Sequence, residues 1–142
     1  MNTRSYDAAL KSIDRIAKPS AQILEAKQKI LFQLGTQSFA NADFEQALKY
    51  LNQSIAIGQY NRQTKADAYY WCGESYYRLN RMMEAARDFN AYLQLTTQPN
   101  NEMYALANYN LGYIAFHRKD YTQASNYFQK YDQLEKGENA TA

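Results

Sequence analysis

The sequence has little of what breaks helices or builds cross-linked and metal-bound frameworks. Its 142 residues include two prolines, five glycines, one cysteine and one histidine. One cysteine excludes an internal disulfide framework and leaves the redox compartment open, and a lone histidine without a cysteine pair does not make a metal site. Since turn-forming residues are scarce while 46% of the chain is hydrophobic, the composition predicts a single helical domain with a packed core.

Long apolar runs, basic blocks and catalytic motifs are missing as well. No stretch of about 18 apolar residues is available to span a bilayer, so we expect no direct membrane insertion. The formal charge of +2 is spread over both signs, which argues against nucleic acid as a partner. Because the chain has no glycine-rich phosphate loop, nucleophile elbow or metalloprotease helix motif, it is predicted not to be an enzyme and to need no cofactor.

One short pattern recurs four times along the chain. It covers 6–10, 44–48, 82–86 and 121–125, and its alanines at positions 9, 47, 85 and 124 are 38, 38 and 39 residues apart. A large apolar residue follows each alanine by four places: Ile13, Leu51, Phe89 and Phe128. A glycine precedes each of the last three alanines by twelve places: Gly35, Gly73 and Gly112. Glycine inside a helix costs about 0.5–1 kcal/mol relative to alanine, so this register predicts two helices in close approach, with the alanine as the glycine's partner.

Short polar segments between each glycine and its alanine predict the turns of antiparallel helix pairs. Asp43 with Gln46, and Asp120 with Gln123, have the spacing of a capping box. In a capping box, the side chain of each of the two residues accepts a hydrogen bond from the backbone N–H of the other. We therefore expect one domain over 1–142 with about seven helices. These are a lone helix at 5–18, then hairpins of 20–39 with 43–58, 61–79 with 82–97, and 100–118 with 121–135, followed by a polar tail at 136–142. The three full repeats cover 20–58, 61–97 and 100–135.

The residues around Gly73 resemble the tetratricopeptide repeat. Tyr69 stands four places before this glycine, and Tyr76, Ala85 and Phe89 stand three, twelve and sixteen places after it. The resemblance implies an all-α, right-handed α-solenoid of antiparallel helical hairpins that serves as a protein-binding scaffold. The period departs from the usual length of about 34 residues. Longer-period repeats of this kind look like those of bacterial cell-envelope adaptors of the YbgF and BamD type.

In that family, the first helices of the hairpins line a concave groove that holds a partner peptide or helix. Carried across by the glycine register, the resemblance assigns nine residues to this groove: Phe32, Thr36, Phe39, Tyr70, Glu74, Tyr77, Tyr109, Tyr113 and Phe116. Seven of the nine are aromatic, which favours an apolar or extended peptide. Glu74 either pairs with a basic or amide group of the ligand or is merely solvated. Some members of the family clamp the C-terminal carboxylate of a partner with polar and basic side chains. At the matching positions of this sequence, Asn110 is the one suitable polar residue, so this mode of binding is disfavoured.

Several aromatic residues also have a purely structural interpretation. Tyr69, Tyr76 and Tyr131 fall at core positions of the repeat, and the groove tyrosines could equally be buried against neighbouring hairpins. Cys72 precedes Gly73 at a core position, where a buried thiol is expected. His117 stands at a helix end, where a cation complements the helix dipole.

Neither end of the predicted stack has a polar cap. The first helix offers Tyr6, Ala9, Leu10, Ile13 and Ile16 to a missing neighbour, and the last offers Tyr127, Tyr131 and Leu134. We expect the array to continue beyond these residues or to cover its ends by self-association. The predicted function is a non-catalytic adaptor for a protein or peptide partner, in the bacterial envelope, the periplasm or the cytoplasm. The alternatives are the sensory or regulatory portion of a signalling protein and an oligomerisation spacer.

Overall fold

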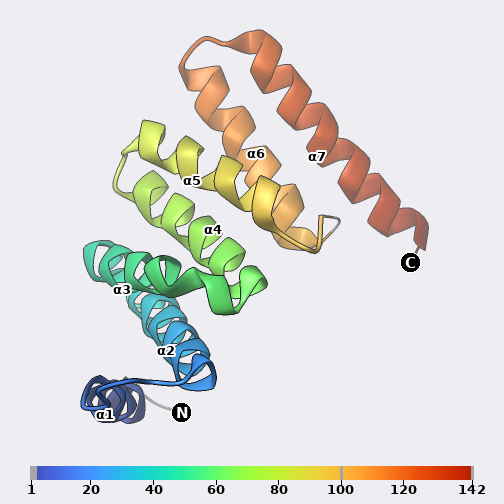
Figure 1. The fold of residues 1–142 in the computed structure, drawn as a ribbon. Coiled ribbons are helices and arrows are strands. Elements are labelled where there is room, and N and C mark those ends of the chain that lie inside the picture. Colours follow the sequence, from blue (N-terminus) through green and yellow to red (C-terminus); the bar gives the residue numbers. More distant parts are fainter. Residues whose placement is uncertain (1–2, 100, 142) are drawn as a thin grey trace.

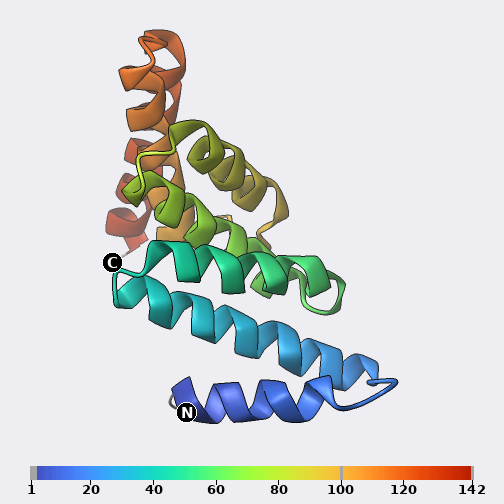
Figure 2. The same cartoon turned by 90° about the vertical axis from the view of Figure 1, so that its left-hand side faces the viewer.

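The computed structural model describes residues 3–99 and 101–141, and over these ranges the chain forms seven α-helices and one short 3₁₀ turn (Figure 1). The elements are α1 (Thr3–Asp14), α2 (Ala21–Ala40), α3 (Phe44–Ile57), η1 (Gly58–Tyr60), α4 (Arg62–Arg78), α5 (Met82–Leu95), α6 (Glu102–His117) and α7 (Tyr121–Thr141). The predicted all-α fold of consecutive antiparallel helix pairs is confirmed, with pairs α2/α3, α4/α5 and α6/α7. Helix α1 packs on α2 at one end of the stack, and α6/α7 form the other end (Figure 2).

Two helix ends differ by more than two residues from the expected ranges. Helix α1 stops at Asp14 rather than at residue 18. The chain leaves the helix through a tighter turn, in which the N–H of Ile16 donates to the Ile13 carbonyl at 3.0 Å, and Pro19 disfavours the helical conformation at the residue before it. Helix α7 continues to Thr141 through most of the expected tail, since no proline interrupts it. Residues 1, 2, 100 and 142 of the predicted ranges lie outside the described residues. None of the described helices is long and apolar enough to cross a membrane.

The turns inside the three hairpins share one geometry. Ala42, Asn80 and Lys119 have positive φ angles of 61°, 60° and 64°, the left-handed conformation that commonly ends a helix. In the first turn, the N–H of Asp43 donates to the Ser38 carbonyl at 2.9 Å. The Asp43 carboxylate then accepts from the N–H of Gln46 at 3.2 Å. The predicted cap is therefore present, but its reciprocal half is replaced, because the Asp43 N–H is already bonded to the preceding helix.

The same cap closes the third hairpin, where Asp120 accepts from the N–H of Gln123 at 3.2 Å. The N–H of Asp120 donates to the Ala115 carbonyl at 2.9 Å. The turn between α6 and α7 is thus held by backbone and side-chain bonds at once, which fixes the direction in which α7 returns along α6.

The repeated glycines bring the paired helices close together, chiefly against a different residue from the one that the register suggested. A Cβ added to Gly73 would lie 2.7 Å from Cδ1 of Phe89, and one added to Gly112 would lie 2.6 Å from Cε1 of Phe128. At Gly35 the nearest atom is Cγ of Leu51, at 2.5 Å. Each glycine thus makes room chiefly for the large apolar side chain four residues after the predicted alanine, and at Gly35 the Ala47 carbonyl oxygen is also in contact, at 3.4 Å.

The core consists of two clusters that follow the stack. One joins Ala66, Tyr70, Ala85, Phe89, Tyr92, Ala107, Leu111 and Ile114 across α4, α5 and α6. The other joins Ala47, Leu48, Leu51, Ala68 and Cys72 across α3 and α4. Trp71 and Tyr76 pack against both clusters, so α4 lies at the centre of the molecule and links the two. The α6/α7 hairpin packs on α5 through one side of α6, and another side of this hairpin is exposed.

Candidate functional site

The groove residues of the first hairpin are partly covered by the second. Phe32 and Phe39 are half-buried and pack against the cluster of α3 and α4. The Phe39 ring meets the Trp71 ring edge-on, with centroids 5.0 Å apart, and the Arg78 guanidinium lies 5.4 Å from its centroid. Thr36 is half-buried, and its hydroxyl donates to the Gln33 carbonyl within the same helix at 3.1 Å. On α2, therefore, the face assigned to a ligand is largely occupied by α4.

Tyr70 belongs to the hydrophobic core rather than to an open surface. It is 3% exposed, and its ring packs edge-on against Trp71, Phe89 and Tyr92 at centroid distances of 5.2, 5.7 and 5.4 Å. Burial, together with the nearby Glu74 carboxylate, raises the pKa of its hydroxyl well above the ordinary value. Of the two interpretations that the sequence left open for Tyr70, the structure supports packing, because the rings of α5 cover it.

Glu74 and Asn110 tie the second hairpin to the third. Oε1 of Glu74 accepts from the Tyr70 hydroxyl at 3.1 Å and from the Asn110 side-chain amide at 2.6 Å. These two predicted groove residues therefore bond to each other across the helices α4 and α6. Tyr77, on the same face of α4, is half-buried and packs against the core cluster of α4, α5 and α6.

The three aromatic groove residues of α6 are the ones that lie open. Tyr109, Tyr113 and Phe116 are 37%, 38% and 50% exposed, and together with Phe128 of α7 they line a cavity of about 300 Å³. Tyr109 lies 5.2 Å from Tyr113 and 5.9 Å from Phe128, measured between ring centroids. We call these four residues the α6 patch. Grouped exposed aromatic rings with a hollow between them are typical of surfaces that bind another chain.

The repeat register explains why this surface is bare. Phe39 and Phe116 hold equivalent places, four residues after Gly35 and four after Gly112. The ring of Phe39 is covered by Trp71 of the next hairpin, and Glu74 of α4 is reached by Asn110 of α6. Among the described residues, no helix stands in the corresponding place beside α6. The same face is thus covered twice in the stack and left open at its third occurrence.

Phe128 is the member of the α6 patch that sequence reasoning missed. The sequence pattern gave it only as the large apolar residue four places after Ala124. Its ring packs against Gly112 and also lines the cavity. Tyr131, which the repeat assigned to the core, is half-buried with its ring 5.1 Å from that of Tyr109. The sequence contained a signal for this, because the large aromatic residues Phe128 and Tyr131 stand four and seven residues after Ala124. The register indicated an uncovered face on the last helix, but it did not show that Phe128 would share a cavity with residues of α6.

The other end of the stack is less exposed than expected. Tyr6, Ala9, Leu10 and Ile13 of α1 are half-buried, and only Ile16 is exposed, at 40%. Lys27 of α2 bonds Asp14 of α1 at 2.8 Å. Exposed rings are therefore concentrated at the α6/α7 end.

Cys72 and His117 lie where their structural interpretations placed them. Cys72 is fully buried beside Gly73, and burial raises the pKa of its thiol above the ordinary value. His117 is the last residue of α6 and is exposed, with its ring 5.8 Å from that of Tyr113. It lies at the edge of the α6 patch, where its ring extends the aromatic surface.

Comparison with known proteins identifies the fold. No family model matches the sequence, and no curated protein does. Among solved structures, the chain is similar to the crystal structure of MamA, with a TM-score of 0.69 and 19% sequence identity over 84% of this chain and 69% of that one. The likeness supports a tetratricopeptide-like helical repeat.

Proposed function

We propose that this protein is a non-catalytic scaffold and that the α6 patch binds an amphipathic helix of a protein partner. The observation that carries the proposal is the open aromatic cavity on α6, at a face whose two equivalents in the stack are covered by helices. A tetratricopeptide-like fold supports a protein partner in general. Aromatic side chains supply large contact area with few rotatable bonds, so they lose little entropy on binding.

The covered faces indicate what the partner helix should present. On α2, the apolar ring of Phe39 receives an aromatic side chain, Trp71. On α4, the polar Glu74 receives the amide of Asn110. On α6 the corresponding positions are Phe116 and Tyr113, so the partner should place a large apolar side chain against Phe116. It should place an apolar or hydrogen-bonding side chain against Tyr113, one helical turn away.

The test compares partner recovery by a patch variant and by a matched surface variant. Tyr113→Ala with Phe116→Ala removes two exposed rings, whereas Met83→Ala removes a side chain that is 71% exposed on α5. Truncating an interface anchor costs about 1–2 kcal/mol or more, so the double variant should bind an identified partner about tenfold more weakly or worse. Met83→Ala should bind like the wild type. Equal affinity of all three proteins, each with the helical circular dichroism of the wild type, would refute the proposal.

The origin of the partner helix and the cellular setting are separable questions. If a second copy of this chain supplies the helix, light scattering will show a dimer that the double variant does not form. A setting among bacterial envelope adaptors is tested by the compartment from which a tagged protein is recovered. A regulatory role in a larger signalling protein would require that partner binding alter the activity of another domain.

A further inference from the structure

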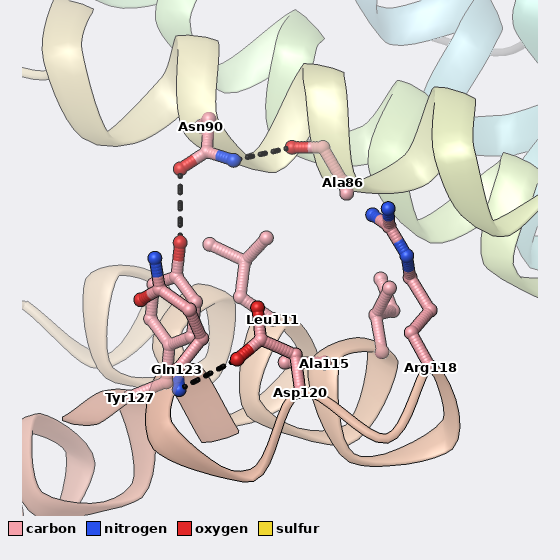
Figure 3. Close-up of a pocket in the computed structure, with 9 residues that line it drawn as sticks. Ala86, Asn90, Leu111, Ala115, Arg118, Asp120, Gln123 and Tyr127 are labelled. Atoms are coloured by element: carbon pink, nitrogen blue, oxygen red, sulfur yellow. Dashed lines mark hydrogen bonds between the residues drawn. The ribbon is translucent and has the colours of Figure 1, made fainter. Parts of the chain in front are cut away.

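A second cavity lies on another side of α6, between α5, α6 and α7 (Figure 3). Its volume is about 170 Å³. The apolar lining comes from Ala86, Leu111, Ile114 and Ala115, and the polar lining comes from Asn90, Arg118, Asp120, Gln123 and Tyr127. None of these residues belongs to the α6 patch. A cavity of about 150 Å³ is large enough to hold a benzene ring.

The cavity arises because two large side chains of the preceding repeat are replaced by alanine. Ala115 stands 39 residues after Tyr76, the same offset that separates Gly73 from Gly112. Ala86 stands 38 residues after Leu48, the offset that separates Gly35 from Gly73. Both Leu48 and Tyr76 pack in the layer between α3 and α4. Their absence one repeat later leaves the contact between α5 and α6 less extensive than that between α3 and α4.

The preceding repeat also shows what fills such a space. The ring of Tyr76 packs against the cluster that contains Leu48 and Cys72, whose counterparts one repeat later are Ala86 and Leu111 of the cavity lining. The guanidinium of Arg81 lies 4.9 Å from the centroid of the Tyr76 ring, and that of Arg87 lies 5.7 Å from it. Cation–π contacts of this kind stabilise a ring that is otherwise only half-buried.

The open cavity has an arginine of its own. Arg118 extends from the end of α6 toward α5 along one side of the cavity (Figure 3). No ion pair joins it to another described side chain, so its guanidinium is available to a ring that enters. Polar atoms are present as well: the Tyr127 hydroxyl donates to Oδ1 of Asn90 over a long 3.5 Å, and the Asn90 amide donates to the Ala86 carbonyl at 3.0 Å. The Asn90 oxygen therefore retains capacity for a further donor.

We infer that this cavity binds a phenol ring, namely a tyrosine side chain of the partner protein, in the place that Tyr76 fills in the preceding repeat. The apolar floor takes the ring, Arg118 lies along its face or edge, and the polar groups of α5 and α7 bond its hydroxyl. The assignment to a partner's tyrosine rests on the proposed scaffold function. The preference for a phenol does not, because it follows from the lining of the cavity.

The experiment titrates the isotopically labelled protein with p-cresol, which is the tyrosine side chain alone, and follows amide shifts by NMR. We expect saturable shifts at Asn90, Leu111 and Ala115. The non-aromatic analogue 4-methylcyclohexanol should bind about two- to fivefold more weakly, as expected from the loss of a cation–π contact. Ala115→Tyr should abolish the shifts by filling the cavity from within, and it should raise the midpoint of thermal unfolding.

A second filled variant, Ala86→Leu, restores the other missing side chain and keeps the test decisive if Ala115→Tyr does not fold. The patch variant Tyr113→Ala should bind p-cresol as the wild type does, which separates this site from the α6 patch. A tyrosine-containing segment of the partner should bind the wild type better than either filled variant. The inference is overturned if p-cresol gives no saturable shifts, if both analogues bind equally, or if filling the cavity leaves binding of p-cresol and of the partner segment unchanged.

Discussion

Replacing Gly73 by alanine tests the close packing on which the stack of hairpins depends. A Cβ at this position would lie 2.7, 2.8 and 2.9 Å from Cδ1, Cε1 and Cγ of Phe89, whereas carbon atoms in contact prefer about 3.5–4.0 Å. Phe89 is fully buried, so its ring cannot swing into solvent. Forcing a methyl group into a packed core costs about 1–3 kcal/mol, and the better helix propensity of alanine offsets about 0.5–1 kcal/mol of that. The free energy of unfolding should therefore fall by about 1–2 kcal/mol.

Urea unfolding followed by far-UV circular dichroism measures this change, and Gly137→Ala is the matched control. A Cβ at Gly137, also in a helix, would meet no atom within 4 Å, so this variant should be neutral or slightly more stable. In a Phe89→Ala background the obstructing ring is gone, and Gly73→Ala should no longer destabilise the protein. If Gly73→Ala stabilises the wild type as Gly137→Ala does, the account of the glycine register is wrong.

Three further predictions concern turns, hairpin contacts and pH. Ala42→Gly should raise the free energy of unfolding by about 0.5–1 kcal/mol, because a left-handed φ of 61° strains alanine but not glycine; a loss of stability in urea unfolding would contradict this. Glu74→Ala should cost about 2–3 kcal/mol, since Tyr70 and Asn110 both lose a charged acceptor. Glu74→Gln, which keeps an acceptor oxygen, should cost about 1 kcal/mol, and equal losses would speak against the hydrogen bonds. Finally, burial raises the pKa of Tyr70 and Tyr92, so above about pH 10 the unfolded chain releases protons that the folded chain retains. Stability should then fall as pH rises, and Tyr70→Phe should reduce the slope by about 1.4 kcal/mol per pH unit; a slope equal to that of the wild type would exclude the burial effect.

The helices and their pairing could be predicted because they depend on short-range spacing. Gly73 and Phe89 belong to one hairpin, and their separation along the chain reports a contact between two adjacent helices. The cap at Asp43 is likewise a local feature. The partner of each glycine could not be identified in this way, since spacing shows which turns of two helices face each other but not which side chain fills the gap.

The groove was harder to predict because a register places a residue on a face without showing what covers that face. Tyr70 and Tyr109 are equivalent in the repeat, and each packs against two rings from the second helix of its own hairpin. Tyr70 is nevertheless buried, in a core cluster that extends to α6, whereas Tyr109 is exposed. The difference lies in the neighbouring elements rather than in either residue's own surroundings in the chain. The cavity at Ala115 was also not predictable from that residue alone. Ala115 indicates a cavity only when it is compared with Tyr76, which holds the equivalent position one repeat earlier.

Site-specific photo-crosslinking tests the central claim most directly, namely that the α6 patch is where a protein partner binds. The photoreactive residue p-benzoylphenylalanine would replace Phe116 in one protein and Met83 in another, both of which are exposed, and each would be irradiated with the partner present. The account predicts that the partner is cross-linked at position 116 and not at position 83. Cross-linking at position 83 alone, or equally at both positions, would contradict it.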